Sequence, residues 1–176
     1  WPVSGDAGSV AVLRMGNLTP DGRIVIDELK YMNLPKELMD RFTVRRGDLL
    51  FNRTNSADLV GKTAVYRGDV PMAYAGYLVR LRMDGGNDPE YLAALLNTGW
   101  AKSTFRGMCK SIVGMANINA NELQNLLVML PPQDLQVEFG RRVSHVIDRE
   151  RSHRAALTSH DELFVSLQHR AFSGQL

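Results

Sequence analysis

Three charged residues near the N-terminal end of the chain have the spacing of a metal-dependent nuclease site. Asp21 follows a proline, and Glu28 and Lys30 then complete a PD-x6-ExK pattern. In such sites carboxylates hold Mg²⁺, and the lysine activates water or stabilises the phosphate. However, Asp21 precedes a glycine as in an ordinary turn, and Glu28 and Lys30 fit an exposed strand face. A Mg-dependent nuclease is therefore kept only as the alternative to a binding function.

Other catalytic patterns are missing from the sequence. No two of the four histidines, at positions 145, 153, 160 and 169, have the i, i+3 or i+4 spacing of helical metal ligands. There is no G-x-x-x-x-G-K-[ST] phosphate loop, no G-x-S-x-G elbow and no NPPY or DPPY methyltransferase stretch. We expect no cofactor, no metal site and no catalytic residue, which leaves a binding module.

Basic residues recur in a segment that carries no acid. Residues 91–121 contain no Asp or Glu, whereas Lys102, Arg106 and Lys110 follow one another every four positions. If one helix continues that far, the three cations share a face with aromatic residues between them. This pattern fits phosphate binding, and it equally fits a solvated helix face beside core aromatics. A second basic cluster comprises Arg41, Arg45, Arg46 and Arg53.

The elements that must position these residues change character along the chain. Turn sequences such as TPDG, NRTNS and DGGNDP separate short apolar runs in the first half, which predicts a mixed sheet with strands at 10–13, 23–26, 48–51, 63–66 and 77–82. A helix is expected near 90–106, with proline in its first turn. Asn119 and Glu122 resemble a capping box, and LLVML is expected to form a short strand before Pro131. The predicted fold class is α+β.

A long helix is predicted at the C-terminal end. Residues 133–171 contain no Pro and only one Gly, and their apolar residues lie on two seven-residue grids. Such a helix would extend about 58 Å, which a small domain cannot cover, so we expect coiled-coil-like pairing with a partner helix. The chain then divides into a globular domain, 1–131, and a helix, 132–176. The expected seam comprises Phe139, Val143, Val146, Leu157, Phe164 and Leu167.

Composition limits the class of protein. The 176 residues are 44% hydrophobic and 23% charged, with a formal net charge of +2, as in ordinary globular domains. Cys109 is the single cysteine, which excludes an internal disulfide and suits a reducing compartment. No apolar run approaches the roughly 20 residues of a membrane-spanning helix. We expect a cytoplasmic protein, and because the chain begins at Trp1 we expect an N-terminal portion of the natural protein to be missing.

Several sequence blocks occur in the order found in a known family. VLRMGNLTPDG comes first, then GDLLFNRTNSADLVGKTAVY, NINANEL with LLVMLPP, PPQDLQVEF and the closing AFSGQL. Together they resemble one target recognition domain and its following conserved helix from the specificity (S) subunit of a type I restriction-modification system. The resemblance covers nearly the whole chain.

The resemblance implies a non-catalytic DNA-recognition subunit, or half of one. Such subunits carry two recognition domains held apart by paired helices, read a bipartite double-stranded DNA target, and recruit methyltransferase (M) and endonuclease/translocase (R) subunits. A single domain and helix would then need a second recognition half or a second copy of itself. A pure assembly module without DNA contact remains a further possibility.

Candidate DNA contacts are chosen by chemistry, since side chains that bond phosphate orient a protein on DNA and side chains that reach base edges give sequence specificity. The acid-free segment supplies four candidates and the loops supply four more. They are Arg53, Asn55, Lys62, Tyr74, Lys102, Arg106, Lys110 and Ser111.

Overall fold

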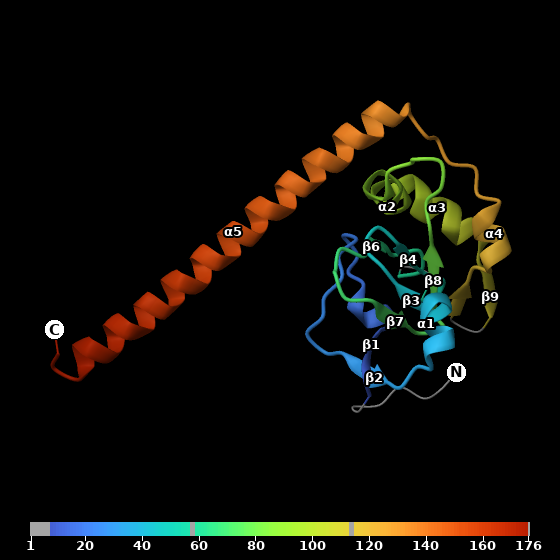
Figure 1. Ribbon diagram of the computed structural model, residues 1–176. Coiled ribbons are helices and arrows are strands. Elements are labelled where there is room, and N and C mark those ends of the chain that lie inside the picture. The colour runs from blue at the N-terminus through green and yellow to red at the C-terminus, as the bar shows by residue number, and fades with distance from the viewer. Residues whose placement is uncertain (1–7, 57–58, 113–114, 176) are drawn as a thin grey trace. The chain divides into compact units, whose positions relative to one another are not determined.

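The computed structural model describes residues 8–56, 59–112 and 115–175. The chain forms two compact units, Trp1–Gln136 and Val137–Leu176, which are described separately. The first unit contains three small sheets and four short α-helices among its described residues, and the second consists of most of one long helix (Figure 1). The predicted α+β class is confirmed, although the single mixed sheet expected from the sequence is divided into three.

The first sheet has the strand order β2-β1-β7-β3. β1 pairs in parallel with β7, and the other two pairings are antiparallel. A 3-10 turn, Met15–Asn17, follows β1, and helix α1, Lys36–Phe42, leads directly into β3. The strands of this sheet are β1, Val10–Leu13, β2, Lys30–Met32, β3, Thr43–Val44, and β7, Met72–Tyr74.

The second sheet is antiparallel and lies at the centre of the first unit. Its order is β6-β4-β8, from β6, Thr63–Val65, β4, Leu49–Asn52, and β8, Leu78–Leu81. All four residues of β4 are buried. Side chains alternate across a strand, so Leu50 contributes to one apolar cluster while Phe51 packs in another with Leu96 and Phe105. A strand covered on both faces explains the continuous apolar run LLF.

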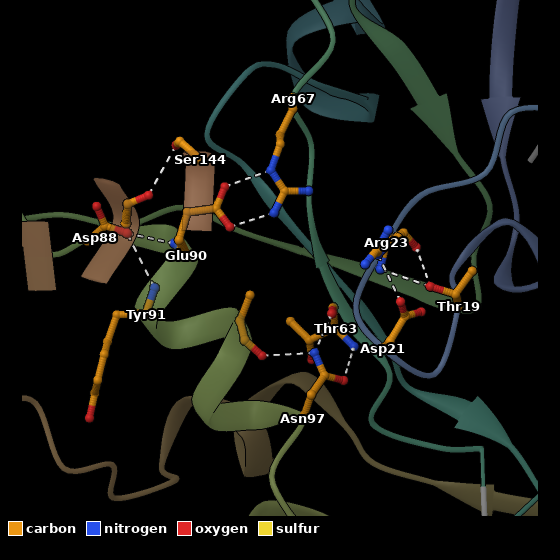
Figure 2. A network of polar contacts seen from close by, with 12 residues as sticks. Thr19, Asp21, Arg23, Thr63, Arg67, Asp88, Glu90, Tyr91, Asn97 and Ser144 are labelled. Atoms are coloured by element: carbon orange, nitrogen blue, oxygen red, sulfur yellow. Dashed lines mark hydrogen bonds and ion pairs between the residues drawn. The ribbon is translucent and has the colours of Figure 1, made fainter. Parts of the chain in front are cut away.

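Two helices cover the second sheet. α2, Pro89–Leu96, begins at Asp88, whose carboxylate accepts hydrogen bonds from the first-turn amides, and a bidentate ion pair between Arg67 and Glu90 ties it to the chain after β6 (Figure 2). The side chain of Asn97 then bonds both the N–H and the C=O of Thr63. Thr98 caps a separate helix, α3, Gly99–Met108. The one helix predicted at 90–106 is therefore two, because Asn97 and Thr98 end the first and start the second.

The third sheet joins segments that are far apart in the sequence. Its order is β5-β10-β9, and both pairings are antiparallel. The strands are β5, Thr54–Asn55, β9, Lys110–Ile112, and β10, Met115–Asn117. β5 lies within the NRTNS stretch and β4 ends at its first residue, Asn52, so this polar segment consists largely of strand residues.

A short helix and an extended connection complete the first unit. α4, Ala120–Gln124, starts with the predicted capping box, in which Asn119 and Glu122 exchange side-chain and backbone hydrogen bonds. Residues 126–130 form no strand, so the prediction for LLVML is wrong. Leu126 and Val128 pack on the core while Leu127 and Met129 are exposed, so the alternation of a strand is present without a pairing partner. The strand predicted at 23–26 is also wrong, since Ile24 forms only an isolated bridge with Leu18.

α5, Gln133–Phe172, confirms the predicted long helix. Its 40 residues correspond to about 60 Å at 1.5 Å per residue. The first turn belongs to the first unit, where the buried side chain of Gln136 accepts from the Asp88 N–H and donates to Asn87 Oδ1 and Pro131 O. In the second unit, four residues of the predicted seam are 43–62% exposed in the single chain: Val146, Leu157, Phe164 and Leu167. Pairing of this helix stays a prediction.

Candidate nucleic-acid interface

The third sheet brings together candidates that were selected from separate parts of the sequence. Asn55 lies opposite Ala116, and Ala116 lies opposite Ser111 on the other side of β10. In the next register position Asn117 lies between Thr54 and Lys110. The backbones of β5 and β9 therefore flank the same strand. The side chains of Lys110 and Ser111 lie outside the part of the structure that is described.

Arg53 occupies a fixed position at the edge of this sheet. Its backbone N–H donates to Tyr77 O at 3.0 Å, and its C=O accepts from Ile118 N at 3.0 Å. Its side chain is partly exposed, and Nε donates to Asn117 Oδ1 at 3.4 Å. Ile118 is fully buried, which anchors this part of the backbone in the core. The Arg53 guanidinium group therefore lies near the surface, on a backbone segment that is hydrogen-bonded on both sides.

α3 presents the second group of basic candidates. Ala101 and Phe105 form its buried face, and the Phe105 ring meets Phe51 edge to face with centroids 5.1 Å apart. Lys102 Nζ donates weakly to Pro20 O at 3.5 Å, whereas Arg106 is exposed. α3 ends at Met108, so the condition under which Lys110 would share a helical face with Lys102 and Arg106 is not met. The stripe consists of two cations on a helix and a third in the neighbouring strand.

Lys62 is buried and its ammonium group points into the fold. Only 7% of the residue is exposed, and Nζ donates to Met15 O at 3.1 Å and to Leu18 O at 2.5 Å. Burial, and secondarily the positive charge of Lys102, lower the pKa of this ammonium. The lysine satisfies carbonyls of the 3-10 turn and its exit, which gives it a structural role in the free chain.

Tyr74 and the arginine cluster are also largely engaged within the fold. The Tyr74 hydroxyl donates to Arg41 O at 3.2 Å, and the Arg80 guanidinium lies 5.9 Å from its ring centroid. Arg45 pairs with Asp40, and Arg46 pairs with Asp69 at 2.7 Å. Two of the four arginines that the sequence suggested are therefore paired with carboxylates, whereas Arg41 lies 5.2 Å from the Phe42 ring centroid and Arg53 lies apart.

The nuclease alternative is not favoured. Asp21 forms an ion pair with Arg23 at 2.8 Å (Figure 2). Its pKa is lowered, first by a hydrogen bond from Thr19. Lys30 lies in β2, opposite Val12 of β1. Among residues 8–56, 59–112 and 115–175, no three His, Cys, Asp or Glu side chains are close enough to hold a metal ion together. The PD-x6-ExK match corresponds to a turn at Asp21, a bend at Glu28 and the first residue of β2 at Lys30, so Glu28 does not lie in the predicted strand.

The longest helix of the described chain is not a membrane span. Neither α5 nor any other described helix combines the length with the apolar character that crossing a bilayer requires. α5 instead carries charged side chains along its length, including ion pairs of Glu138 with Arg141 and Arg142.

Two residues of the third sheet, beside these candidates, were not anticipated. Thr54 and Asn117 are joined by a 3.0 Å hydrogen bond from Thr54 Oγ1 to Asn117 Oδ1. Thr54 was visible in the sequence as part of NRTNS, but nothing in the local pattern relates it to a residue 63 positions away. The cross-strand pair becomes apparent only from the register of β5 and β10.

The fold and this surface define an α+β domain with exposed basic groups that continues into a long helix. The proteins that it resembles in sequence all carry the same kind of name. No family model matches the chain. The chain is 27% identical over 97% of its length to the type I restriction enzyme StySPI specificity subunit of Salmonella potsdam. It is 30% identical over 70% of its length to the putative type I restriction enzyme MjaX specificity subunit of Methanocaldococcus jannaschii. A third relative, 25% identical over 94% of the chain, is the type I restriction enzyme EcoKI specificity subunit of Escherichia coli.

The chain is thus a relative of type I restriction enzyme specificity subunits. It spans 38%, 30% and 37% of the lengths of these three proteins. A solved structure concerned with complex assembly and conformational transition of the type I R-M system has a similar fold, with a TM-score of 0.52 and 21% identity. That match covers 97% of this chain and 40% of the solved one.

Proposed function

We propose that this chain is one DNA-recognition half of a type I restriction-modification specificity subunit and that it catalyses no reaction itself. The observation that carries the proposal is the sequence similarity to specificity subunits over almost the entire chain. The globular part, 1–131, binds double-stranded DNA, and the helix, 132–176, sets the distance to a second recognition half. That half is another domain of the same subunit or a second copy of this chain.

The proposed complex contains partners that supply the chemistry. Methyltransferase subunits modify the bound site, and the endonuclease/translocase subunit joins the same assembly in the cytoplasm. The chain directs both to a bipartite target. Because a single domain makes few base contacts, and each good bidentate contact contributes about 1–3 kcal/mol of discrimination, high specificity requires both halves.

The proposed DNA surface combines the third sheet with the exposed side of α3. Arg53, Lys102 and Arg106 supply positive charge that no carboxylate of the described residues neutralises, and Asn55 adds a polar group two residues after Arg53. Lys110 and Ser111 are retained because β9 adjoins Asn117. Lys62 and Tyr74 are retained as candidates only if DNA binding releases their present hydrogen bonds.

Selection of bound duplexes from a random pool tests the proposal. The subunit is assembled with its methyltransferase partner and presented with the pool, and we expect enrichment of one bipartite sequence. Equal affinity for all duplexes would contradict sequence recognition. Reversal of charge at Lys102 and Arg106 should lower affinity and flatten the salt dependence, since each lost phosphate contact removes about 0.9 from the slope of log K against log salt. Unchanged binding would favour a pure assembly module.

A further inference from the structure

The Arg53 backbone is held on both sides by hydrogen bonds, and its side chain is directed toward Asn117 by one more. Both backbone polar groups of Arg53 are bonded, to Tyr77 O and to Ile118 N, so a shift of the backbone at Arg53 would break these two hydrogen bonds. The Nε–H of its side chain donates a hydrogen bond to Asn117 Oδ1 at 3.4 Å. A guanidinium group that is fixed through Nε keeps its two terminal nitrogens free to act as a fork.

The acceptor capacity of Asn117 is fully used inside the protein. Asn117 Oδ1 accepts one hydrogen bond from Arg53 Nε and a second from Thr54 Oγ1 at 3.0 Å. A carbonyl-type oxygen has two lone pairs, so both are occupied. Asn117 is exposed, and among the described residues no group accepts a hydrogen bond from its Nδ2 or from the terminal nitrogens of Arg53. The surface formed by Arg53 and Asn117 therefore presents N–H donors and no acceptor from these two side chains.

We propose that Arg53 and Asn117, oriented by Thr54, form a donor-only clamp for a pair of acceptor atoms on DNA. This inference rests on the proposed function and deepens it by naming the ligand chemistry. Two sources on DNA have that chemistry: the O6 and N7 atoms of guanine, and two oxygens of one phosphate. The major-groove edges of adenine and cytosine carry an amino donor, which the clamp cannot satisfy because the Asn117 oxygen is already taken. Asn117 in this state cannot make the bidentate contact that asparagine makes to adenine.

Four substitutions in the assembled subunit separate the roles of the three residues. Arg53→Ala removes the fork, and we expect affinity for the selected duplex to fall roughly 5- to 150-fold. Asn117→Asp keeps the acceptor for Arg53 and Thr54 but replaces the outward donor with a carboxylate oxygen, so the fold should persist while DNA binding is lost. Thr54→Val should weaken binding, and Thr54→Ser should restore it. Arg46→Ala is the charge-matched control, because Asp69 already binds its guanidinium group.

The salt slope and a repeated duplex selection distinguish the two sources of acceptors. If the clamp binds phosphate, Arg53→Ala lowers the slope by about 0.9 and weakens all duplexes alike. If the clamp binds guanine, the preference at one base pair disappears and the slope is nearly unchanged. Either result supports the clamp, provided that thermal unfolding of the variants matches the unmodified protein.

The outcomes that overturn the inference differ from those that overturn the proposed function. The unmodified complex could select a sequence while the Arg53→Ala or Asn117→Asp complex binds that sequence equally well. This result would leave the proposed function intact and contradict the clamp. Absence of DNA binding by the unmodified complex removes both.

Discussion

Lys62 shows how a residue in a functional-looking motif can serve the fold. Replacing Lys62 with Met keeps an unbranched apolar side chain but removes the ammonium group, so the carbonyls of Met15 and Leu18 lose the hydrogen bonds from Lys62. We expect the free energy of unfolding to fall by about 1–3 kcal/mol, measured by urea denaturation. Lys36→Met, at an exposed position in the first turn of α1, is the control and should change little. An unchanged midpoint for Lys62→Met would show that the two hydrogen bonds contribute no net stability.

The lowered pKa of Lys62 gives this comparison a pH dependence. Between the folded-state pKa and the higher pKa of the unfolded chain, the unfolded state binds more protons, so the contribution of Lys62 to stability increases with pH. Below the folded-state pKa both states are charged and the contribution is constant. The difference between the unmodified chain and Lys62→Met should therefore widen as the pH approaches the ordinary lysine value.

At the residue scale, sequence chemistry identified candidate groups but not their partners. Lys62 and Arg53 are both cations within the same motif, yet one is buried against carbonyls and the other is partly exposed. Local sequence could not separate them, because burial depends on the 3-10 turn at residues 15–17 and on a strand pair formed with residue 117. Long-range pairing of this kind leaves no periodic signal in the chain.

At the element scale, substitution of two glycines distinguishes the cost of backbone strain from the cost of steric crowding. Gly47 and Gly61 both have positive φ, +90° and +84°, but a Cβ on Gly47 meets nothing within 4 Å, whereas one on Gly61 would lie 2.4 Å from Phe105 Cδ2. Gly47→Ala should cost about 1–2 kcal/mol from strain alone. Gly61→Ala should cost about 1–3 kcal/mol more, because α3 must move away from the loop before β6. Equal urea midpoints for the two variants would contradict the close packing of Phe105.

Elements with strong local sequence signals were predicted well. Breaks and pairings that depend on residues far away in the sequence were not. The apolar run of β4, the capping box of α4 and the uninterrupted pattern of α5 were all recognised from local residues. The break at Asn97 was missed because its side chain bonds Thr63 on another strand. LLVML was expected to form a strand because it is a short apolar run that ends at Pro131, but such a run does not by itself supply a neighbouring strand to pair with.

At the scale of the whole molecule, the exposed seam of α5 predicts association. Leu157→Asp combined with Phe164→Asp places two charges at positions that are 62% and 61% exposed in the single chain. We expect a dimer of the unmodified chain to become monomeric by light scattering, because carboxylates cannot be buried in an apolar seam without a partner. Thr158→Asp with Val165→Asp introduces the same charge one position off the seam and should leave the mass unchanged. Equal masses for the seam variant and the unmodified chain would exclude this seam.

The third sheet also sets when the proposed clamp can exist during synthesis. Thr54 and Asn117 are 63 residues apart, so a ribosome adding roughly 5–20 residues per second makes Asn117 about 3–13 s after Thr54. During that interval Arg53 lacks both Asn117 and the backbone bond from Ile118. A nascent chain therefore contains the positive charge of Arg53 before the residues that complete the proposed clamp. We expect it to discriminate between DNA sequences only after most of the globular unit has been made.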